Sequence, residues 1–591
     1  MISLVRIRLA TAVALFSTSL GGVVALAAPP NPGTAATTPL ASLAGNPGVP
    51  AMVDLETKMT DSLQFGHAVP VVFDSPDQTV GHVVSAPYWG DTELWTGVYL
   101  GGESMRYAVA KHYLTTTSPD HGKSMGMGNS GNAPGHNKDT LSDDEREFWT
   151  AQREESLARV RTILAAEHRD INIAEDWTGE LRVPPSVNTQ DPSGPHSADF
   201  GGGVIHGERG MVTRGCTPVG LGPLGINPPN SDAANPINNH SNHVYEITWQ
   251  HGDGGRYYCE TSPSRDTYAG LVFGLLTAFD MVGPDESALR AQIRDDVLAM
   301  ADFLVKYGWN FPRPNGYVGT RNDEDGFISP LMLHVPMARL NIANAARQVA
   351  DAAGSAADRQ KWDAVWAEEL ASQGPILGSS LEVNSAQPNE GYFKFNLDHL
   401  NGFNLLRTLK GSERDVMLRG FAAMDKTTRD DINAHFEAIT YAVTGDVGRR
   451  DAAVTHLGEW LTYRSATGDG QPIHNSARCG SEFACVPKDQ DDLAVDQVPG
   501  GSVTWYPGAP DAPPLSNASG LRAARPLPVA VRPPADFLWQ QPPTALDGQQ
   551  SPSWREPGID FLTPYWMLRY YTEVAPPLST PFPEWVGPAH L

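Results

Sequence analysis

Apolar residues recur at intervals of three and four along most of the chain from about residue 88 onward. This is the period of an amphipathic helix. The pattern predicts helices at residues 91–114, 143–168, 265–283, 286–307, 329–351, 357–371, 396–410, 412–425, 430–443, 449–464 and 558–573. Sequential helix pairs can close into a ring of hairpins or stack as an open solenoid. A solenoid would show a repeat of constant length, and the chain has none, so the pattern favours closure.

Alternating patterns typical of strands are rare. The clearest is HVYEITWQHGDGGRYYCE at 243–260, where two aromatic and β-branched runs flank a glycine-rich turn, which predicts a β-hairpin. It lies in an irregular insertion at 169–263. A second irregular, proline-rich insertion spans 466–555. Stretches of this length are usually functional or disordered rather than plain connections.

The first residues have the pattern of a cleaved signal peptide at 1–27: two arginines, an apolar stretch and the sequence Ala25-Leu26-Ala27. A membrane anchor is the alternative, but the apolar stretch is short for a span. Residues 28–85 then predict a flexible leader and N-terminal extension. The helical region is expected at 86–465, with a last helix and tail at 556–591. We therefore expect a secreted or periplasmic protein that is soluble after cleavage.

The chain of 591 residues has a formal net charge of −25, and removing Arg6 and Arg8 with the signal peptide makes it two units more negative. An acidic surface argues against nucleic acid or an anionic membrane as partner. The oligomeric state is not encoded in any pattern that we recognise.

Four cysteines occur in two pairs that are local in sequence. In an exported protein this predicts disulfides Cys216–Cys259 and Cys479–Cys485. A metal site is the alternative, but these spacings lack the close grouping that cysteine ligands need.

Two helix starts share one pattern: an acid, an aromatic residue two positions later, and glycines four and eight positions after the acid. These are Glu93, Trp95, Gly97 and Gly101 in the first, and Asp266, Tyr268, Gly270 and Gly274 in the second. Residues four apart lie on one helix face. Because glycine destabilises a helix, two on one face indicate close approach of a neighbouring helix. We expect Glu93 and Asp266 to face one common cavity. Asp91 has no acidic counterpart and is interpreted as a helix cap.

Later helix starts repeat parts of this pattern. Asp398 lies four residues before Gly402, and His435 and Glu437 occur early in another helix. Each acid could equally satisfy free N–H groups of its own first turn, which is the structural alternative at every position.

The motifs WGDTELWTG, SRDTYAGL and FNLDHLNGFNLL at starts of paired helices resemble the (α/α)6-barrel superfamily of carbohydrate-active enzymes. It includes glycoside hydrolases, unsaturated-uronide hydrolases, sugar epimerases and toroid domains of polysaccharide lyases. The resemblance covers 86–465 and 556–573. It implies a mainly α toroid with a carbohydrate pocket at the barrel mouth, lined by carboxylates and by aromatic rings that stack on sugars.

Two reactions suit such a pocket. Glycoside hydrolysis needs two carboxylates, about 5–5.5 Å apart for retention or about 6.5–9.5 Å for inversion. β-Elimination on a uronate needs a base, a donor and a cation, for which His399 or His435, Tyr268 and Arg106 or Arg265 are available. The candidate catalytic residues are Glu93, Asp266, Asp398, His399, His435 and Glu437, and the candidate substrate-binding residues are Trp89, Trp95, Tyr268, Arg265 and Trp566.

No cofactor is expected. The segment NDEDG at 322–326 has part of a calcium loop's alternating oxygens but not the full twelve-residue pattern, so calcium is a weak alternative. No glycine-rich phosphate-binding loop precedes a predicted helix in the required context. The sequence thus favours an exported glycan hydrolase. A lyase, or a secreted glycan-binding or scaffold protein without catalytic acids, remains open.

Overall fold

The computed structural model describes residues 48–87, 89–116, 141–177, 181–182, 204–205, 207–226, 244–260, 263–281, 286–309, 336–374, 392–467, 473–475, 478–479, 481–482, 484–487, 521–523, 525–533, 535, 537–548 and 553–578. The expected signal peptide and the NDEDG segment lie outside these residues. Among the described residues, no helix is long and apolar enough to cross a membrane.

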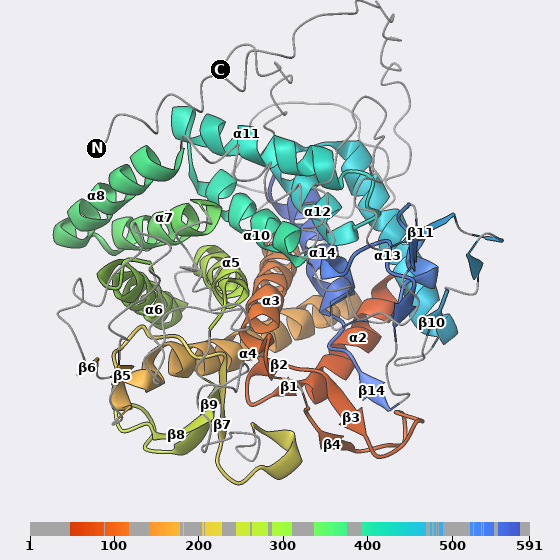
Figure 1. The fold of residues 1–591 in the computed structure, drawn as a ribbon, viewed down its shortest axis with the longest axis horizontal. Helices are drawn as coiled ribbons and strands as arrows, with labels where there is room; N and C mark the ends of the chain where they lie inside the picture. Colours follow the sequence, from red (N-terminus) through yellow and green to blue (C-terminus); the bar gives the residue numbers. More distant parts are fainter. Residues whose placement is uncertain are drawn as a thin grey trace, which may run out of the picture.

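The described part is mainly helical with few strands, as the sequence predicts (Figure 1). The α-helices are α2 (Gly48–Ser62), α3 (Thr92–Thr116), α4 (Asp143–Asn172), α5 (Arg265–Met281), α6 (Ser287–Lys306), α7 (Pro336–Ala353), α8 (Ala356–Gln373), α10 (Phe393–Thr408), α11 (Gly411–Thr428), α12 (Ala434–Thr444), α13 (Val447–Thr467) and α14 (Ile559–Arg569). Each predicted helix overlaps one of them. Helix α2 was missed, because it begins inside a Pro-, Ala- and Gly-rich stretch.

Alternate helices are neighbours in space. Helix α3 packs against α5 and α14, α10 packs against α5, α7 and α12, and α12 packs against α14. The intervening helices pair with their predecessors along the chain: α3 with α4, α5 with α6, α7 with α8, α10 with α11 and α12 with α13. One large apolar core joins these helices.

Helices α3 and α5 run parallel in very close contact. A Cβ on Gly270 would lie 2.3 Å from the carbonyl oxygen of Leu94, and one on Gly274 would lie 2.3 Å from that of Gly97. Residues later in α5 contact residues later in α3, so both helices begin at the same end of the molecule. The close helix approach predicted from the glycine pairs is confirmed.

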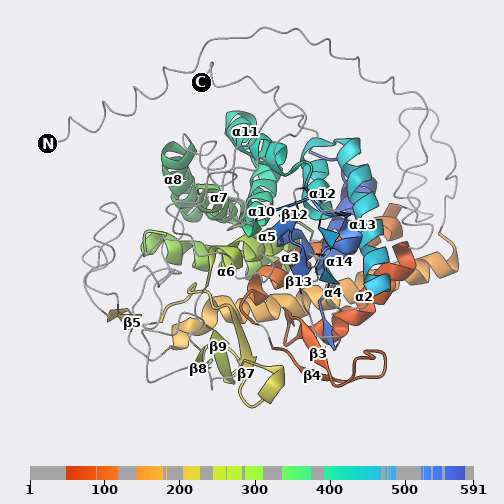
Figure 2. The same ribbon diagram turned by 45° about the vertical axis from the view of Figure 1, so that its right-hand side comes forward.

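The strands form small antiparallel sheets. The strands are β1 (Leu63–Gln64), β2 (His67–Ala68), β3 (Val71–Phe73), β4 (Val83–Ser85), β5 (Leu181–Arg182), β6 (Val204–Ile205), β7 (Gly215–Pro218), β8 (Val244–Thr248), β9 (Arg256–Glu260), β10 (Ile473–His474), β11 (Cys485–Pro487), β12 (Leu521–Ala523), β13 (Asp547–Gly548) and β14 (Trp554–Arg555). The two three-stranded sheets have the orders β14-β3-β4 and β7-β9-β8, and both views show β3, β4, β7, β8 and β9 on one side of the helices (Figures 1 and 2).

The sheet β7-β9-β8 confirms the predicted hairpin, with Ile247 opposite Tyr257. Cys216 and Cys259 are direct partners in the β7–β9 register and form one disulfide. Cys479 and Cys485 form the second. Both predicted disulfides are therefore confirmed. The first disulfide links β7 to β9, the strand that precedes α5 in the chain.

Helix α2 is attached to the helical core by a buried ion network. The Glu56 carboxylate lies 3.1 Å from Arg106 Nη1, is paired with Arg159, and accepts a hydrogen bond from Trp566 Nε1 at 3.0 Å. Burial raises the pKa of Glu56, but the two guanidinium groups outweigh it and the pKa is lowered. The region expected as a flexible N-terminal extension thus contains an ordered, ion-paired helix.

Candidate functional site

The first candidate site lies where α3 and α5 begin side by side. Arg214, which precedes β7, has its Nη1 atom 3.7 Å from Asp91 Oδ1 and its Nε atom 4.0 Å from Glu260 Oε1. It also donates to the carbonyl of Gly90. Asp266, in the first turn of α5, is close enough for the Asp91 charge to raise its pKa. The two helix starts therefore hold Asp91, Glu260 and Asp266 around one guanidinium group.

Burial raises the pKa of two of these carboxyl groups, those of Asp266 and Glu260. It is the main cause that raises the pKa of Asp266 to about 6 and that of Glu260 to about 7, and the Asp91 charge adds to both shifts. The Asp91 side chain keeps 23% of its surface exposed. Asp266 is partly exposed as well. A carboxyl group with a raised pKa beside a more exposed carboxylate is the pairing that acid–base catalysis uses.

Asp398 on α10 is a fourth acid, linked to this group through Arg265. It is buried, which raises its pKa to about 7, and the positive charges of Arg265 and Lys394 oppose that rise. Arg265 acts in the same direction on Asp266. Arg265 thus acts electrostatically on both predicted acids, Asp266 and Asp398, which come from two different helices.

Glu93 lies in a different cluster. It is buried, and its Oε1 atom is 3.5 Å from His67 Nδ1, while His67 Nε2 is 3.0 Å from Asp170 Oδ2. Glu167, one turn before Asp170 on α4, is also buried and meets the Glu93 carboxyl group. Asp266 is not among the main causes of the raised pKa of Glu93, whereas Asp91 is among those that raise the pKa of Asp266. Glu93 and Asp266 thus have different main neighbours, and a cavity common to both stays a prediction.

A tight turn brings His67 into this second cluster. Phe65 and Gly66, between β1 and β2, both have positive φ values, of 54° and 91°. A Cβ on Gly66 would lie 2.6 Å from the Ala166 side chain and 2.9 Å from the Thr162 carbonyl oxygen, so the turn is seated directly on α4. The next strand is fixed to α3, because the backbone N–H of Ala68 donates to Thr96 Oγ1 at 3.0 Å.

The buried carboxyl groups of this cluster cannot all be ionised without strong repulsion. Burial is the main cause of the raised pKa of Glu93, and the neighbouring Glu167 and Asp170 charges raise it further. Burial likewise raises the pKa of Glu167 to about 8. Asp170 differs: burial favours its protonation, but Arg169 and His67 outweigh this and lower its pKa. A cluster of this kind holds protons or a cation.

The sequence analysis missed His67, Glu167 and Asp170. The available signal was the spacing of Glu167 and Asp170, which places two acids on one face of α4. Nothing local marks His67, because its partners Glu93, Arg169 and Asp170 all lie on later helices of the chain.

The expected sugar-stacking rings are core side chains in this structure. Trp95 and Tyr268 are each 1% exposed, and Trp95 lies against Phe537, with ring centroids 4.6 Å apart. Trp89 is buried and donates from Nε1 to the Ala86 carbonyl at 2.8 Å. Trp566 belongs to the Glu56 ion network. A ring needs an exposed face to stack on a sugar, and none of the four presents one.

The two candidate histidines are also fully buried. His399 stacks on Phe436 at 3.9 Å between centroids and its Nδ1 lies 2.7 Å from the Phe395 carbonyl oxygen. His435 lies edge-on to Phe537. Burial lowers the pKa of each to about 3, so both are neutral at ordinary pH.

Glu437 lines an open depression between α11, α12 and α13, with a volume of about 510 Å³. His456 Nδ1 lies 2.8 Å from Glu437 Oε2. Asp425, on the same depression, is paired with Arg449 at 2.7 Å. Glu437 is therefore separated from the acids at the starts of α3 and α5.

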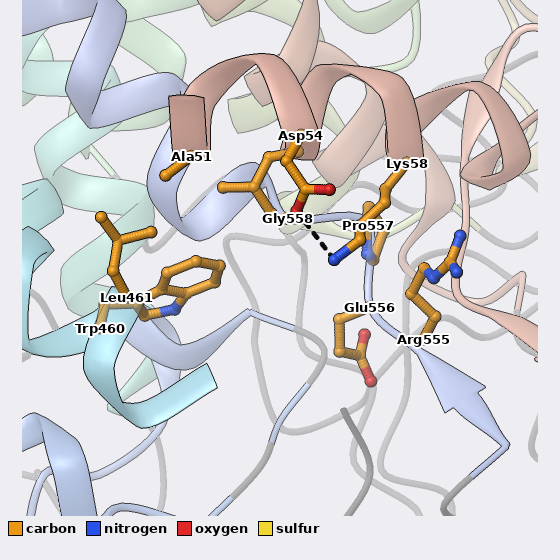
Figure 3. A pocket seen from close by; sticks show the side chains of 10 residues that line it. Ala51, Asp54, Lys58, Trp460, Leu461, Arg555, Glu556, Pro557 and Gly558 are labelled. Atoms are coloured by element: carbon orange, nitrogen blue, oxygen red, sulfur yellow. Dashed lines mark ion pairs between the residues drawn. The ribbon is translucent and has the colours of Figure 1, made fainter. Parts of the chain in front are cut away.

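A smaller pocket of about 180 Å³ lies between α2, α13 and the segment that leads into α14 (Figure 3). Asp54 and Lys58 form an exposed ion pair on its α2 side, and Glu556 lies on the opposite side. The Glu556 carboxylate accepts a hydrogen bond from Trp554 Nε1. The pocket contains none of the predicted catalytic residues.

Comparisons of the chain with protein-family models, with curated proteins and with solved structures find no match. The functional argument for this protein therefore rests on its own residues and their arrangement.

Proposed function

We propose that this protein is an exported enzyme that hydrolyses glycosidic bonds, using Asp91 and Asp266 at the paired starts of α3 and α5. The observation that carries the proposal is the proximity of these two carboxyl groups, with the pKa of Asp266 raised to about 6. Such a group keeps its proton at mildly acidic pH and can protonate a leaving oxygen, while Asp91 acts as the base or nucleophile.

The surrounding charges suit this division of roles. Arg214 forms an ion pair with Asp91 at 3.7 Å, whereas burial raises the pKa of Asp266. Two carboxyl groups in such different environments suit the acid and base roles of glycoside cleavage. Asp398 and Arg265 would bind polar groups of the sugar from the α10 side.

The architecture that we propose is an (α/α)6 toroid. Helices α3, α5, α7, α10, α12 and α14 would form the inner ring, and their partners would form the outer layer. The neighbour relations of these helices support this arrangement, because each inner helix packs against the next one, and α14 packs against α3. The mouth would then lie at the end where α3 and α5 begin.

Export is part of the proposal. The N-terminal signal-like sequence supports it, and so do two disulfides, which persist mainly in oxidising compartments.

The decisive test is activity on a panel of neutral and uronic polysaccharides, followed as released reducing ends and as ultraviolet-absorbing unsaturated product. We expect reducing ends without unsaturated product. Asp266→Asn and Asp91→Asn should each lower the rate by about 10²–10⁴. Asp295→Asn, which removes a half-exposed acid on α6, is the matched control and should keep full activity.

Unsaturated product would assign the protein to the lyases instead. A wild-type protein that binds a glycan but releases nothing would support a binding role. Full activity in both Asp91→Asn and Asp266→Asn would contradict the site assignment, provided that both variants unfold at the wild-type temperature.

A further inference from the structure

The Glu93 cluster brings metal-binding groups together in the interior. His67 from β2, Glu93 from α3 and Asp170 from α4 each offer one ligand atom, and these atoms lie within 4.8 Å of one another. All three side chains are at most 1% exposed. Three separate elements converge on this point, so its geometry is set by the packing of the fold.

Two of these groups present atoms that no donor side chain reaches. His67 Nδ1 and both carboxylate oxygens of Glu93 are buried and receive no hydrogen bond from a donor. They face each other at 3.5 Å. Nitrogen and oxygen ligands bind zinc at about 2.0–2.2 Å, so two adjacent ligands of one tetrahedral ion lie about 3.4 Å apart.

The charge of the cluster also calls for a cation. Glu93, Glu167 and Asp170 are three buried carboxyl groups. Among the described residues, Arg169 is the one arginine or lysine bonded to them, donating from Nε to Asp170 Oδ1 at 3.2 Å. With these groups ionised and His67 neutral, two negative charges remain uncompensated. One divalent ion supplies the matching charge, and burying unpaired carboxylates without it is strongly unfavourable.

We propose that His67, Glu93 and Asp170 bind one divalent transition-metal ion, Zn²⁺ or Mn²⁺, with Glu167 as the adjacent fourth carboxylate. The imidazole is the reason for this class, since Ca²⁺ and Mg²⁺ prefer all-oxygen sites. His67 Nε2 lies 3.0 Å from Asp170 Oδ2 and donates its proton there in the tautomer that binds metal, which leaves the lone pair of Nδ1, on the Glu93 side, for the ion. This site is separate from the proposed Asp91–Asp266 pair.

Because the ligands are buried, the ion would enter as the protein folds. The test is therefore to refold the full chain with Zn²⁺, with Mn²⁺ or with Ca²⁺, to dialyse against metal-free buffer, and to measure bound metal by mass spectrometry. We expect one Zn²⁺ or Mn²⁺ per chain and no retained Ca²⁺. His67→Gln and Glu93→Gln should each weaken binding at least tenfold, and Asp295→Asn should bind as the wild type does.

A second readout can be taken on the wild-type protein itself. Co²⁺ bound to a nitrogen and several oxygens absorbs visible light, and the wild-type protein refolded with Co²⁺ should show these bands in a ratio of one ion per chain. Glu167→Gln removes the charge of the adjacent carboxylate and keeps the size of the side chain. This variant should alter the Co²⁺ absorption bands without unfolding the protein.

A wild-type protein that retains no Zn²⁺ or Mn²⁺ and shows no Co²⁺ bands would overturn the proposal and leave the cluster as a buried, proton-sharing ion network. Equal metal content in the wild type, His67→Gln and Glu93→Gln would overturn it as well. Because the readout is bound metal, these outcomes are independent of whether any polysaccharide is cleaved.

Discussion

Gly97 and Gly270 meet where α3 lies against α5, so closely that a Cβ on Gly97 would fall 2.2 Å from the Gly270 carbonyl oxygen. The obstacle is backbone and not the end of a flexible side chain. A side chain here could be accommodated only by moving the two helices apart. This contact sets the separation of the two helix starts, and with it the relative position of Asp91 and Asp266.

Substitution of either glycine by alanine should therefore destabilise the protein. For Gly97→Ala and Gly270→Ala we expect a loss of about 1–3 kcal/mol or more in the free energy of unfolding, measured by urea denaturation, because overpacking a tight contact forces backbone shifts. Gly458→Ala in α13 is the control. A Cβ there would meet nothing within 4 Å, so this variant should be about 0.5–1 kcal/mol more stable. Equal effects at all three positions would contradict the close-contact interpretation.

Glu56 should be essential for docking α2. Its removal by Glu56→Ala leaves Arg106 and Arg159 with less compensation in the interior, and breaking a buried ion pair costs about 3–5 kcal/mol. Thermal unfolding followed by circular dichroism measures this loss. Glu154→Ala removes an exposed partner of Arg153, 3.6 Å away, and should change stability by no more than about 0.5 kcal/mol. A similar small change for Glu56→Ala would mean that α2 is not held by this network.

Much of the fold follows from local sequence signals. The helical period places α3 to α14 within a few residues, and the capping of α12 by the Asn433 side chain explains why that helix begins later than its apolar pattern suggests. The two cysteine pairs and the β8–β9 hairpin are equally local features. The glycine pairs predict that α3 and α5 approach closely, because only a close contact justifies glycine within a helix.

The site was less predictable, because sequence matching does not give the direction in which the side chains of two packed helices point. Aligning Gly97 with Gly270 makes Glu93 the counterpart of Asp266, and these two glycines do meet in the structure. Asp91, however, and not Glu93, is the acid whose charge raises the pKa of Asp266. Glu93 instead meets His67, whose position depends on a positive-φ turn seated on α4, and no periodic pattern encodes such a contact.

The Cys216–Cys259 disulfide should contribute more stability than the Cys479–Cys485 disulfide. The first joins residues 43 apart in sequence and the second joins residues 6 apart. A disulfide stabilises the folded protein by reducing the conformational entropy of the unfolded chain, and a longer loop has the larger effect. We therefore expect the free energy of unfolding to fall by about 4 kcal/mol in the double variant Cys216→Ser/Cys259→Ser and by about 2 kcal/mol in Cys479→Ser/Cys485→Ser. Denaturant titrations of the two variants measure this difference. A larger loss from the shorter loop would show that native-state effects outweigh the loop entropy.

The buried Asp398 carboxyl group should make the protein less stable as the pH rises. Its pKa is about 7 in the folded state against 3.8 for an unperturbed aspartate, because burial outweighs the opposing charges of Arg265 and Lys394. The folded protein thus holds a proton that the unfolded chain releases, and this contribution to stability is lost between about pH 4 and pH 7.

Asp398→Asn removes this titration while keeping the size of the side chain. Relative to the wild type, the variant should therefore gain stability as the pH rises from 4 to 8, by a few kcal/mol over the whole range. The measurement is urea denaturation of both proteins at each pH. Asp295→Asn on α6 is the control, and its stability curve should run parallel to that of the wild type. If the Asp398→Asn curve is parallel too, Asp398 is ionised in the folded protein throughout this range and cannot serve as a proton donor beside Asp266.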